Sequence, residues 1–220
     1  MTQWRNFHGR THGKTLRQGQ RALLAGALPD LTLRGVTRGE NPARETIAVP
    51  SPLWLEIGFG SGEHLVHSAR LHPDVTHLGA EPFVNGVAAL LAKLAAEPLP
   101  NVLLHPGDAR DLLDVLPEGS VSRAFLLYPD PWPKARHHKR RFVTPGPLGQ
   151  LARALAPGAE LRIATDIEDY ARQAREACAA TGFRLLSEGP EPWEGWTRTR
   201  YEAKALREGR GPRYQVWARP

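Results

Sequence analysis

Apolar residues along the chain gather in short runs rich in Leu, Val and Ile. There are seven of them: LWLEIGF (53–59), VTHLGAE (75–81), NVLLHPG (101–107), VSRAFLLYP (121–129), ELRIATD (160–166), FRLLSEG (183–189) and RYQVWAR (213–219). Runs of this length, bounded by Gly, Pro or acidic residues, are typical of buried β-strands. The pattern therefore predicts seven strands.

Longer amphipathic stretches separate several of these runs. Three of them have helical spacing: EHLVHSARLH (63–72), VNGVAALLAKLAAE (84–97) and IEDYARQAREACAATG (167–182). Because parallel strands need crossover helices, the alternation predicts a doubly wound α/β fold with a mostly parallel sheet. Residues 191–212 are polar and rich in Gly and Pro, so we expect the last strand to return as a hairpin and run antiparallel. Residues 22–50 are expected to be rich in loops.

A chain of 220 residues is long enough for one sizeable core. We expect a basic, partly flexible N-terminal extension over residues 1–45 and a single domain over residues 46–220. The apolar runs are too short to span a membrane, and polar residues follow Met1, so we expect a cytoplasmic protein. Cys178 is the only cysteine and is expected to pack in the core. A monomer is slightly preferred to a dimer.

The net charge of +6 is concentrated in two segments. Residues 1–21 carry five basic residues and no acid (Arg5, Arg10, Lys14, Arg17, Arg21), and residues 134–141 carry five more. Removing these ten from the 29 Lys and Arg leaves 19, against 23 Asp and Glu. Charge gathered in this way favours binding to a phosphate backbone over a merely solubilising surface.

The ends of the predicted strands carry candidate ligand-binding residues. In an open α/β sheet the ligand lies outside the carboxyl ends of the strands. The first strand ends in LEIGFGSGEH, which contains Glu56 followed by Gly58, Gly60 and Gly62. This G-x-G-x-G spacing differs from the G-x-G-x-x-G of dinucleotide-binding loops. The second strand ends at Glu81, which is suited to ribose hydroxyls, and the third is followed by Asp108, which is suited to an adenine amino group.

Three acids beside a glycine loop favour a ligand that is neutral or positively charged there. S-adenosylmethionine, with its sulfonium, fits this description. After the fourth strand, the stretch YPDPWPKARHHKRRF (128–142) holds Asp130 between two prolines, which stiffen its backbone. His137 and His138 are adjacent and lack the spaced partners of a zinc site, so no metal is expected.

These motifs resemble the bacterial tRNA (guanine-N7)-methyltransferases, which have the Rossmann-like class I methyltransferase fold. The resemblance runs through LEIGFGSGEHL, GAEP, PGDARDLL, YPDPWPKARHHKRRF, ATDIEDYA and TRYEAKALREG. It departs from the family at His138, where Asn is expected, and at Tyr128, where Phe is common. The family substrate is the variable-loop guanine at position 46 of tRNA.

The resemblance implies a role for each matching residue. It implies that Glu56, Glu81, Asp108 and the glycine loop contact S-adenosylmethionine, and that Asp130 is catalytic and also lies at the donor. It implies that Lys134, Asp166, Thr199, Arg200, Tyr201 and Glu202 bind the substrate. It implies contacts with RNA from Arg136, His137, His138, Lys139, Arg140 and Arg141.

Guanine N7 carries a lone pair and no proton, so its methylation requires no general base. Positioning and electrostatic stabilisation must then supply most of the catalysis. Either Asp130 or Asp166 would accept hydrogen bonds from N1–H and the N2 amino group of guanine. Trp132 or Tyr128 would stack on the base, although Trp132 would equally suit core packing.

Two other classes of function stay open at this point. One is a methyltransferase for a small molecule, in which the basic segments are incidental. The other is a non-catalytic RNA-binding module that keeps the fold. An adenine N6-methyltransferase is disfavoured, because a single Pro separates Asp130 from Trp132. The basic N-terminal segment is expected to become ordered on binding tRNA.

Overall fold

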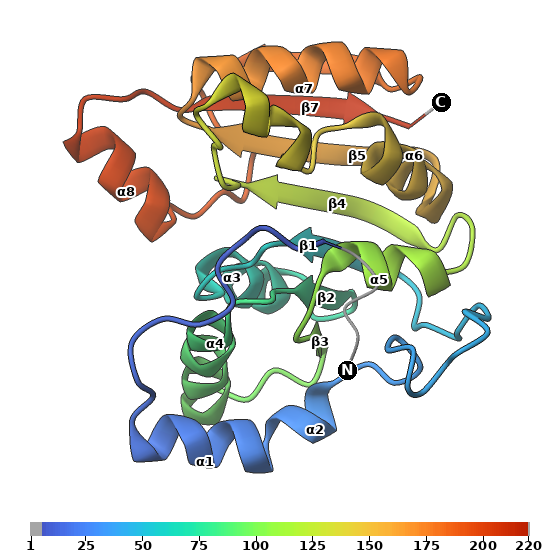
Figure 1. Cartoon of the computed structure of the whole chain (residues 1–220), viewed down its shortest axis with the longest axis vertical. Coiled ribbons are helices and arrows are strands. Elements are labelled where there is room, and N and C mark those ends of the chain that lie inside the picture. The colour runs from blue at the N-terminus through green and yellow to red at the C-terminus, as the bar shows by residue number, and fades with distance from the viewer. Residues whose placement is uncertain (1–5, 220) are drawn as a thin grey trace.

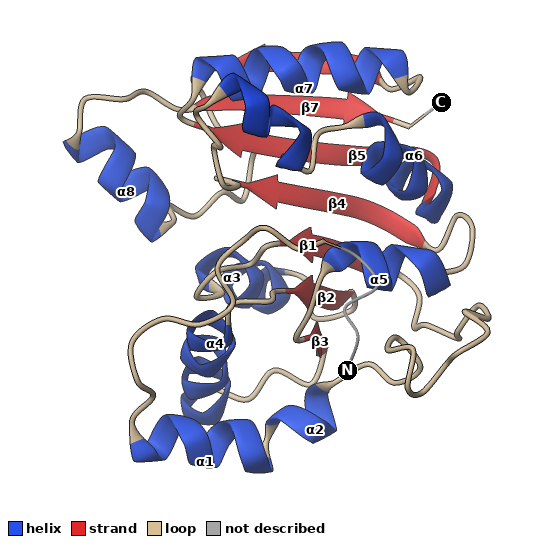
Figure 2. Ribbon diagram, in the orientation of Figure 1, coloured by secondary structure: helices blue, strands red, loops and turns tan. Residues whose placement is uncertain are grey.

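The computed structural model describes residues 6–219, and its strands form one seven-stranded sheet (Figures 1 and 2). The strands are β1 (Leu53–Ile57), β2 (Thr76–Ala80), β3 (Val102–His105), β4 (Val121–Leu127), β5 (Leu155–Thr165), β6 (Arg184–Gly189) and β7 (Arg213–Ala218). Each coincides with one of the seven apolar runs, so all seven predicted strands are confirmed. Their order is β3-β2-β1-β4-β5-β7-β6.

The last strand runs against the others. Strands β1 to β5 pair in parallel, whereas β7 pairs antiparallel with both β5 and β6. The predicted antiparallel last strand is therefore confirmed, and it lies between β5 and β6 rather than at the edge. The chain order reverses between β1 and β4, which is the point where an open α/β sheet leaves a crevice for a ligand.

The helices are more numerous than the sequence pattern indicated. The three predicted helices are present as α3 (Glu63–Leu71), α4 (Val84–Ala96) and α7 (Glu168–Ala180). The others are α1 (Gln18–Gly26), α2 (Leu28–Leu31), α5 (Ala109–Val115), α6 (Pro145–Ala154), α8 (Arg200–Arg207) and the 3₁₀ helix η1 (Ala135–Arg140). None of these helices is long and apolar enough to cross a membrane, judged over residues 6–219.

Side chains alternate between the two faces of the sheet, as the two-residue period of a strand requires. On β4, Ala124 and Leu126 lie in the core beneath α5, α6 and α7, while Phe125 and Leu127 point to the opposite face. That opposite face has two parts. Helices α3 and α4 cover the part over β2 and β3, and an aromatic cluster covers the part over β4, β5 and β7. Each buried Leu contributes about 1.5–3 kcal/mol to stability.

The expectation of a loop-rich segment over residues 22–50 was wrong in its first part. Helices α1 and α2 place Leu23, Leu24, Leu28 and Leu31 against the core formed by α3 and α4. Beyond them, the backbone N–H of Leu33 donates to the carbonyl of Leu104 at 2.9 Å, which covers the free edge of β3. Tertiary packing thus converts a weakly patterned segment into part of the fold.

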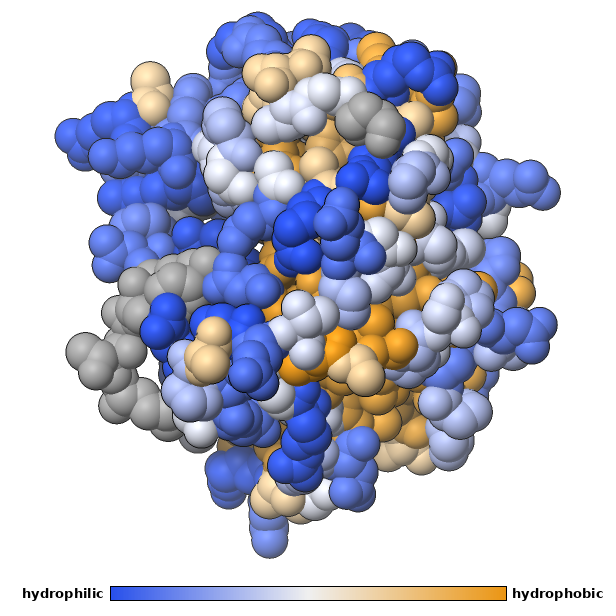
Figure 3. All heavy atoms as spheres, turned by 90° about the vertical axis from the view of Figure 1, so that its right-hand side faces the viewer, coloured by the Kyte–Doolittle hydropathy of each residue, from blue (hydrophilic) through white to orange (hydrophobic). Residues whose placement is uncertain are grey.

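The surface away from α8 is shown in Figure 3. Hydrophobic residues gather in the middle of this face and hydrophilic residues surround them. Among the described residues, the large hydrophobic side chains with most exposure are scattered over several elements: Leu71, Leu185, Leu186, Tyr201 and Leu206.

One close backbone contact joins α4 to the glycine loop. A Cβ atom added at Gly86 would lie 2.2 Å from the carbonyl oxygen of Gly60, which is a clash with backbone. Gly86→Ala should therefore displace the loop and lower the melting temperature by roughly 2–10 °C, since overpacking costs about 1–3 kcal/mol.

Gly149, in the exposed middle of α6, is the matched control, because its added Cβ would meet nothing within 4 Å. Gly149→Ala should be neutral or stabilising by up to about 1 kcal/mol. Calorimetric melting of both variants checks the contact, and equal melting temperatures would contradict it.

Candidate functional site

A cleft of about 880 Å³ opens at the carboxyl ends of β1, β2 and β4. Its walls come from the glycine loop (residues 58–62), the proline turn (residues 128–133), the start of α5, Tyr201 on α8 and an N-terminal arm (residues 6–14). In Figure 1 the arm is the dark blue segment that runs up from α1. The cleft thus lies where the order of the strands reverses, as expected for this fold.

The glycine loop turns sharply because three of its residues have left-handed backbone. The φ angles of Gly58, Gly60 and Gly62 are 73°, 58° and 75°, a region that glycine adopts without steric cost. The N–H of Gly58 donates to the carbonyl of Ala80 at 2.8 Å, which ties the loop to β2. A Cβ at Gly58 would meet nothing within 4 Å, so the backbone there is open to a ligand.

Glu81 holds the loop and faces the cleft. One carboxylate oxygen accepts from the N–H of Gly60 at 2.7 Å, and the other accepts from the N–H of Phe83 at 2.8 Å. Each oxygen keeps a second lone pair for a ligand hydroxyl. Burial and, to a smaller extent, the charge of Asp130 raise the pKa of Glu81 to about 6, against the lowering effect of these two bonds.

Asp108 also lines the cleft, but its carboxylate already has a partner. It caps α5 by accepting from the N–H of Arg110 at 2.9 Å, and the Arg110 guanidinium pairs with both carboxylate oxygens. Arg110 also donates to the carbonyl of Asn6 at 3.1 Å. Sequence analysis missed Arg110, although its position two residues after a helix-capping acid is a usable signal.

Glu56 lies beneath the cleft and is not among the residues that line it. Only 4% of its surface is exposed, and its carboxylate accepts from Nδ1 of His64 at 2.7 Å. The pair joins the end of β1 to α3. The structure therefore gives this acid a protein partner directly below the glycine loop.

The proline turn presents Asp130 between two residues with unusual backbone. Tyr128 and Trp132 have φ angles of 47° and 44°, which non-glycine residues rarely adopt. The N–H of Tyr128 donates to the carbonyl of Ala164 at 2.7 Å and so fixes the turn to β5. Asp130 stays accessible in the cleft, yet desolvation by the surrounding walls raises its pKa, while Arg10 of the arm lowers it.

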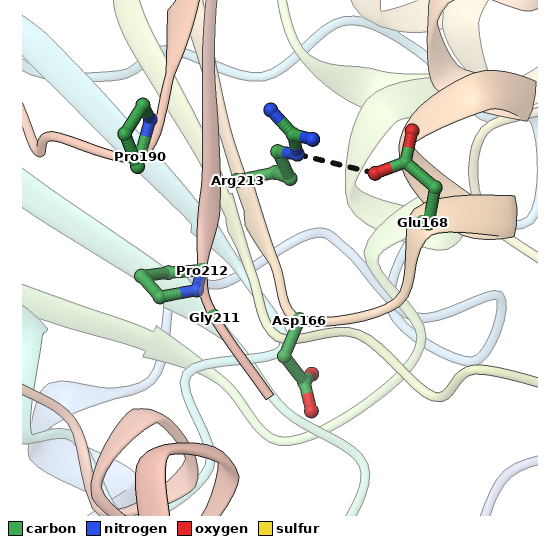
Figure 4. A pocket seen from close by; sticks show the side chains of 6 residues that line it. All are labelled: Asp166, Glu168, Pro190, Gly211, Pro212 and Arg213. Atoms are coloured by element: carbon green, nitrogen blue, oxygen red, sulfur yellow. Dashed lines mark hydrogen bonds and ion pairs between the residues drawn. The ribbon is translucent and has the colours of Figure 1, made fainter. Parts of the chain in front are cut away.

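Asp166 lies at the end of β5, beside a separate shallow pocket of about 370 Å³. Its carboxylate pairs with Nε of Arg210 at 2.5 Å. In Figure 4 this carboxylate points away from the neighbouring ion pair between Glu168 and Arg213. The two predicted guanine-binding acids, Asp130 and Asp166, therefore line different hollows at the ends of adjacent strands.

Of the predicted substrate residues 199–202, some make hydrogen bonds within the protein and others are exposed. Thr199 caps α8 by accepting from the N–H of Glu202 at 3.2 Å. Glu202 is buried and accepts from Trp196 Nε1 at 2.9 Å and from the Tyr214 hydroxyl at 2.8 Å. Tyr201 alone of the four lines the cleft, where its hydroxyl accepts from Arg200 at 2.9 Å.

Sequence analysis also missed the aromatic cluster to which Glu202 is tied. Trp193, Trp196 and Tyr214 form mutual edge-to-face contacts with ring centroids 5.1–5.6 Å apart. Trp196 also packs against His64, the partner of Glu56. Two tryptophans within the polar stretch EPWEGW were the available signal, because tryptophan is rarely placed where nothing covers it.

The basic segment after the proline turn is not uniformly exposed. Lys134, Arg136 and Lys139 are exposed, and the Arg140 guanidinium lies 5.0 Å above the Trp132 ring. Arg141 is buried, with 2% of its surface exposed. The prediction that Arg141 contacts RNA is therefore corrected: its side chain lies inside the protein. His137 packs edge-on against Trp132, and His138 lies 3.3 Å from Asp169.

The N-terminal arm is already attached to the domain. The N–H of Val84 donates to the carbonyl of Thr11, and Asn85 exchanges hydrogen bonds with Gly13 and Lys14 at 2.7 Å each. Residues 6–14 thus contact α4 in the structure, and the ordering of the N-terminal segment on binding tRNA stays a prediction. Arg5, part of the predicted basic cluster, lies outside the described residues. Within residues 6–219, no three His, Cys, Asp or Glu side chains are grouped to hold a metal ion.

Comparisons with known proteins identify the family of the chain. A family model described as "Putative methyltransferase" matches residues 50–213. A "tRNA (guanine-N(7)-)-methyltransferase" of Paracoccus denitrificans is 57% identical, covering 98% of this chain and 95% of its own length. A protein of the same name from Cereibacter sphaeroides is 58% identical, covering 98% and 92%.

Solved structures give the same fold. That of the 16S rRNA methyltransferase KamB covers 83% of this chain and 93% of its own, with a TM-score of 0.57 and 19% sequence identity. That of the aminoglycoside resistance methyltransferase NpmB1 covers 86% and 98%, with a TM-score of 0.56 and 19% identity. The Rossmann-like methyltransferase fold is therefore confirmed.

Proposed function

Because the chain belongs to the tRNA (guanine-N(7)-)-methyltransferase family, we propose that it methylates N7 of a tRNA guanine, with S-adenosylmethionine as the donor. By resemblance to the family, the target is guanine 46 in the variable loop. The observation that carries the proposal is that Glu81 and Asp130 line one cleft, at the point where the strand order reverses.

The cleft fits the donor in size and chemistry. A volume of about 880 Å³ lies within the range of small-molecule sites. The open backbone at Gly58 would accommodate the methionine part, and Glu81 would accept hydrogen bonds from both ribose hydroxyls. Asp108 would accept the adenine amino group beside Arg110, and Glu56 would support the site from beneath the loop. When bound, the donor supplies a methyl group on a positively charged sulfur.

Asp130 would act on the other partner of the reaction. Its carboxylate would accept hydrogen bonds from the N1–H and N2 groups of guanine and so hold N7 in line with the methyl group. As the methyl group is transferred, positive charge passes from sulfur to the purine ring, and Asp130 would stabilise it there. Desolvation raises the pKa of Asp130, and the nearby positive charge of Arg10 lowers it. Asp166 would contact the nucleotide from the adjacent hollow.

The exposed cations next to the proline turn would bind the tRNA backbone. Lys134, Arg136, Lys139 and Arg140 follow the turn directly, so bound phosphates would lie beside the cleft. Such contacts fix register without reading sequence. Tyr201 and Trp132 would flank the base at the cleft walls, and Arg200 would lie near its phosphate.

Incubation with labelled S-adenosylmethionine and unmodified tRNA, followed by mapping of the modified base, tests the function. We expect label at N7 of the variable-loop guanine. Label in small molecules alone would favour a small-molecule methyltransferase, and tRNA binding without donor binding would favour an RNA-binding module. Label at another ring position would contradict the proposed reaction.

Asp130→Asn keeps the shape of the side chain and removes its charge. With both substrates saturating, turnover should fall by roughly 10²-fold, because electrostatic stabilisation of the transition state is lost. The dissociation constant for tRNA, measured separately, should change little. Asp74→Asn, in an exposed loop before β2, is the control and should turn over normally. Wild-type turnover by Asp130→Asn would refute this role.

The pKa of Glu81 predicts how donor binding depends on pH. Ribose hydroxyls donate to the ionised carboxylate, so affinity should strengthen as pH rises from 5 through about 6 and level off near 7. Glu81→Gln should bind the donor roughly 10- to 100-fold more weakly at pH 7.5, since hydrogen bonds to a charged group contribute about 1.5–3 kcal/mol.

Calorimetric titration with S-adenosylmethionine at several pH values checks both effects. The affinity of Glu81→Gln should be nearly independent of pH between 5 and 7, because the titrating carboxyl has been removed. A pH dependence as steep as that of the wild type would show that another group is responsible.

A further inference from the structure

The proline turn cannot hold its own shape with backbone hydrogen bonds. Pro129, Pro131 and Pro133 lack an N–H, so half of residues 128–133 have no backbone donor. The turn also contains two residues with left-handed backbone, Tyr128 and Trp132. Such conformations persist only where the surroundings fix them. The carbonyl groups that follow Asp130 must therefore find donors elsewhere.

Arg141 supplies those donors. Its Nε donates to the carbonyl of Pro131 at 2.8 Å, and Nη2 lies 3.5 Å from the carbonyl of Trp132. Pro131 directly follows Asp130 in the chain. The guanidinium thus contacts the carbonyl groups of the two residues that follow the acid.

The other side of the guanidinium is bound to α7. Nη2 pairs with the Asp169 carboxylate at 2.8 Å. Nη1 donates to Gln173 Oε1 at 2.8 Å and also lies 3.4 Å from the backbone carbonyl of Asp169. Gln173 is oriented in turn by donating to the carbonyl of Val143 at 3.0 Å. The ring of Tyr170 lies 5.2 Å from the guanidinium and covers it.

This arrangement uses all the donors of the side chain. A guanidinium has five N–H groups, and the five acceptors named above match them. The Arg141 side chain has no exposed surface, whereas Lys139 and Arg140 beside it are accessible. Although Arg141 lies at the cleft, its side chain therefore has no free donor and no exposed surface to offer a phosphate.

We propose that Arg141 is a positioning residue that sets the orientation of Asp130 by fastening the proline turn to α7. The proposal rests on the function proposed above, because it assigns Asp130 to the reaction. Since α7 begins just after Asp166, the same buried cation fixes the distance between the ends of β4 and β5. A lysine has three donors on a flexible stem and cannot span both sides.

Arg141→Lys tests the proposal against a matched control. Arg153 on α6 likewise donates to two backbone carbonyls, those of Leu116 at 2.9 Å and Leu113 at 2.6 Å, but far from the cleft. Both Arg→Lys variants should lose a few degrees of melting temperature. With saturating tRNA and donor, turnover should fall roughly 10- to 100-fold in Arg141→Lys and stay at the wild-type value in Arg153→Lys.

The KM for tRNA separates positioning from phosphate binding. It should stay within about threefold of the wild-type value in Arg141→Lys, whereas in Arg140→Gln it should rise because a phosphate contact is lost. For Arg141→Ala, guanidinium chloride at concentrations too low to unfold the protein should restore part of the turnover. Gln173→Leu removes one of the five acceptors of Arg141, together with the hydrogen bond that Gln173 donates to Val143, and should show a smaller loss of turnover in the same direction.

Hydrogen exchange followed by mass spectrometry supplies a measurement that does not depend on activity. In Arg141→Lys, amides of residues 130–142 should exchange faster, while those of α6 should not change. If the wild-type protein failed to methylate guanine N7, the proposed function would fall, but this measurement would still test the fastening of the turn. Unchanged exchange, a raised KM with normal turnover, or an equal loss of turnover in Arg153→Lys would each overturn the proposal.

Discussion

Several backbone groups in the loops at the carboxyl edge of the sheet are paired with charged side chains from neighbouring segments, and not with strand or helix backbone. Glu81 accepts from the N–H groups of Gly60 and Phe83, and Lys93 donates to the carbonyl of Ser61 at 2.5 Å. Arg141 does the same for the proline turn. Because an unpaired buried peptide group costs about 1–3 kcal/mol, these loops could not keep their shape without the charges.

Because Glu81 pairs with these loop N–H groups, its carboxylate lies near Asp130 with little access to water. The pKa of Glu81 rises to about 6 because burial disfavours its charge. A raised pKa means that the folded protein holds this proton more tightly than the unfolded chain. Its contribution to stability is therefore full below pH 4.5 and is lost as pH rises through about 6, at a cost on the order of 2 kcal/mol. A cationic ligand in the cleft would offset that cost.

Local signals in the sequence were sufficient for the strands and for most acids of the cleft. Short apolar runs located all seven strands, and the strand ends located Glu81, Asp108 and Asp130. Contacts between residues far apart in the chain could not be predicted from these local signals. The burial of Glu202 depends on Trp196 and Tyr214, and the packing of α1 depends on α4, so neither could be inferred from a window of neighbouring residues.

The run KARHHKRRF shows this limit most clearly. Its cations are indistinguishable by type and spacing, yet Arg140 lies over Trp132 while Arg141 is buried against α7. The difference arises because η1 ends at Arg140, and Arg141 continues in extended backbone with φ −64° and ψ 147°. Its side chain then meets Asp169 and Gln173, about 30 residues further along the chain. A run of basic residues therefore predicts a positively charged surface only where none of its side chains is bound by buried acceptors. Here one of the five cations, Arg141, is bound by buried acceptors, whereas its neighbour Arg140 lies over Trp132 on the surface proposed to bind phosphates.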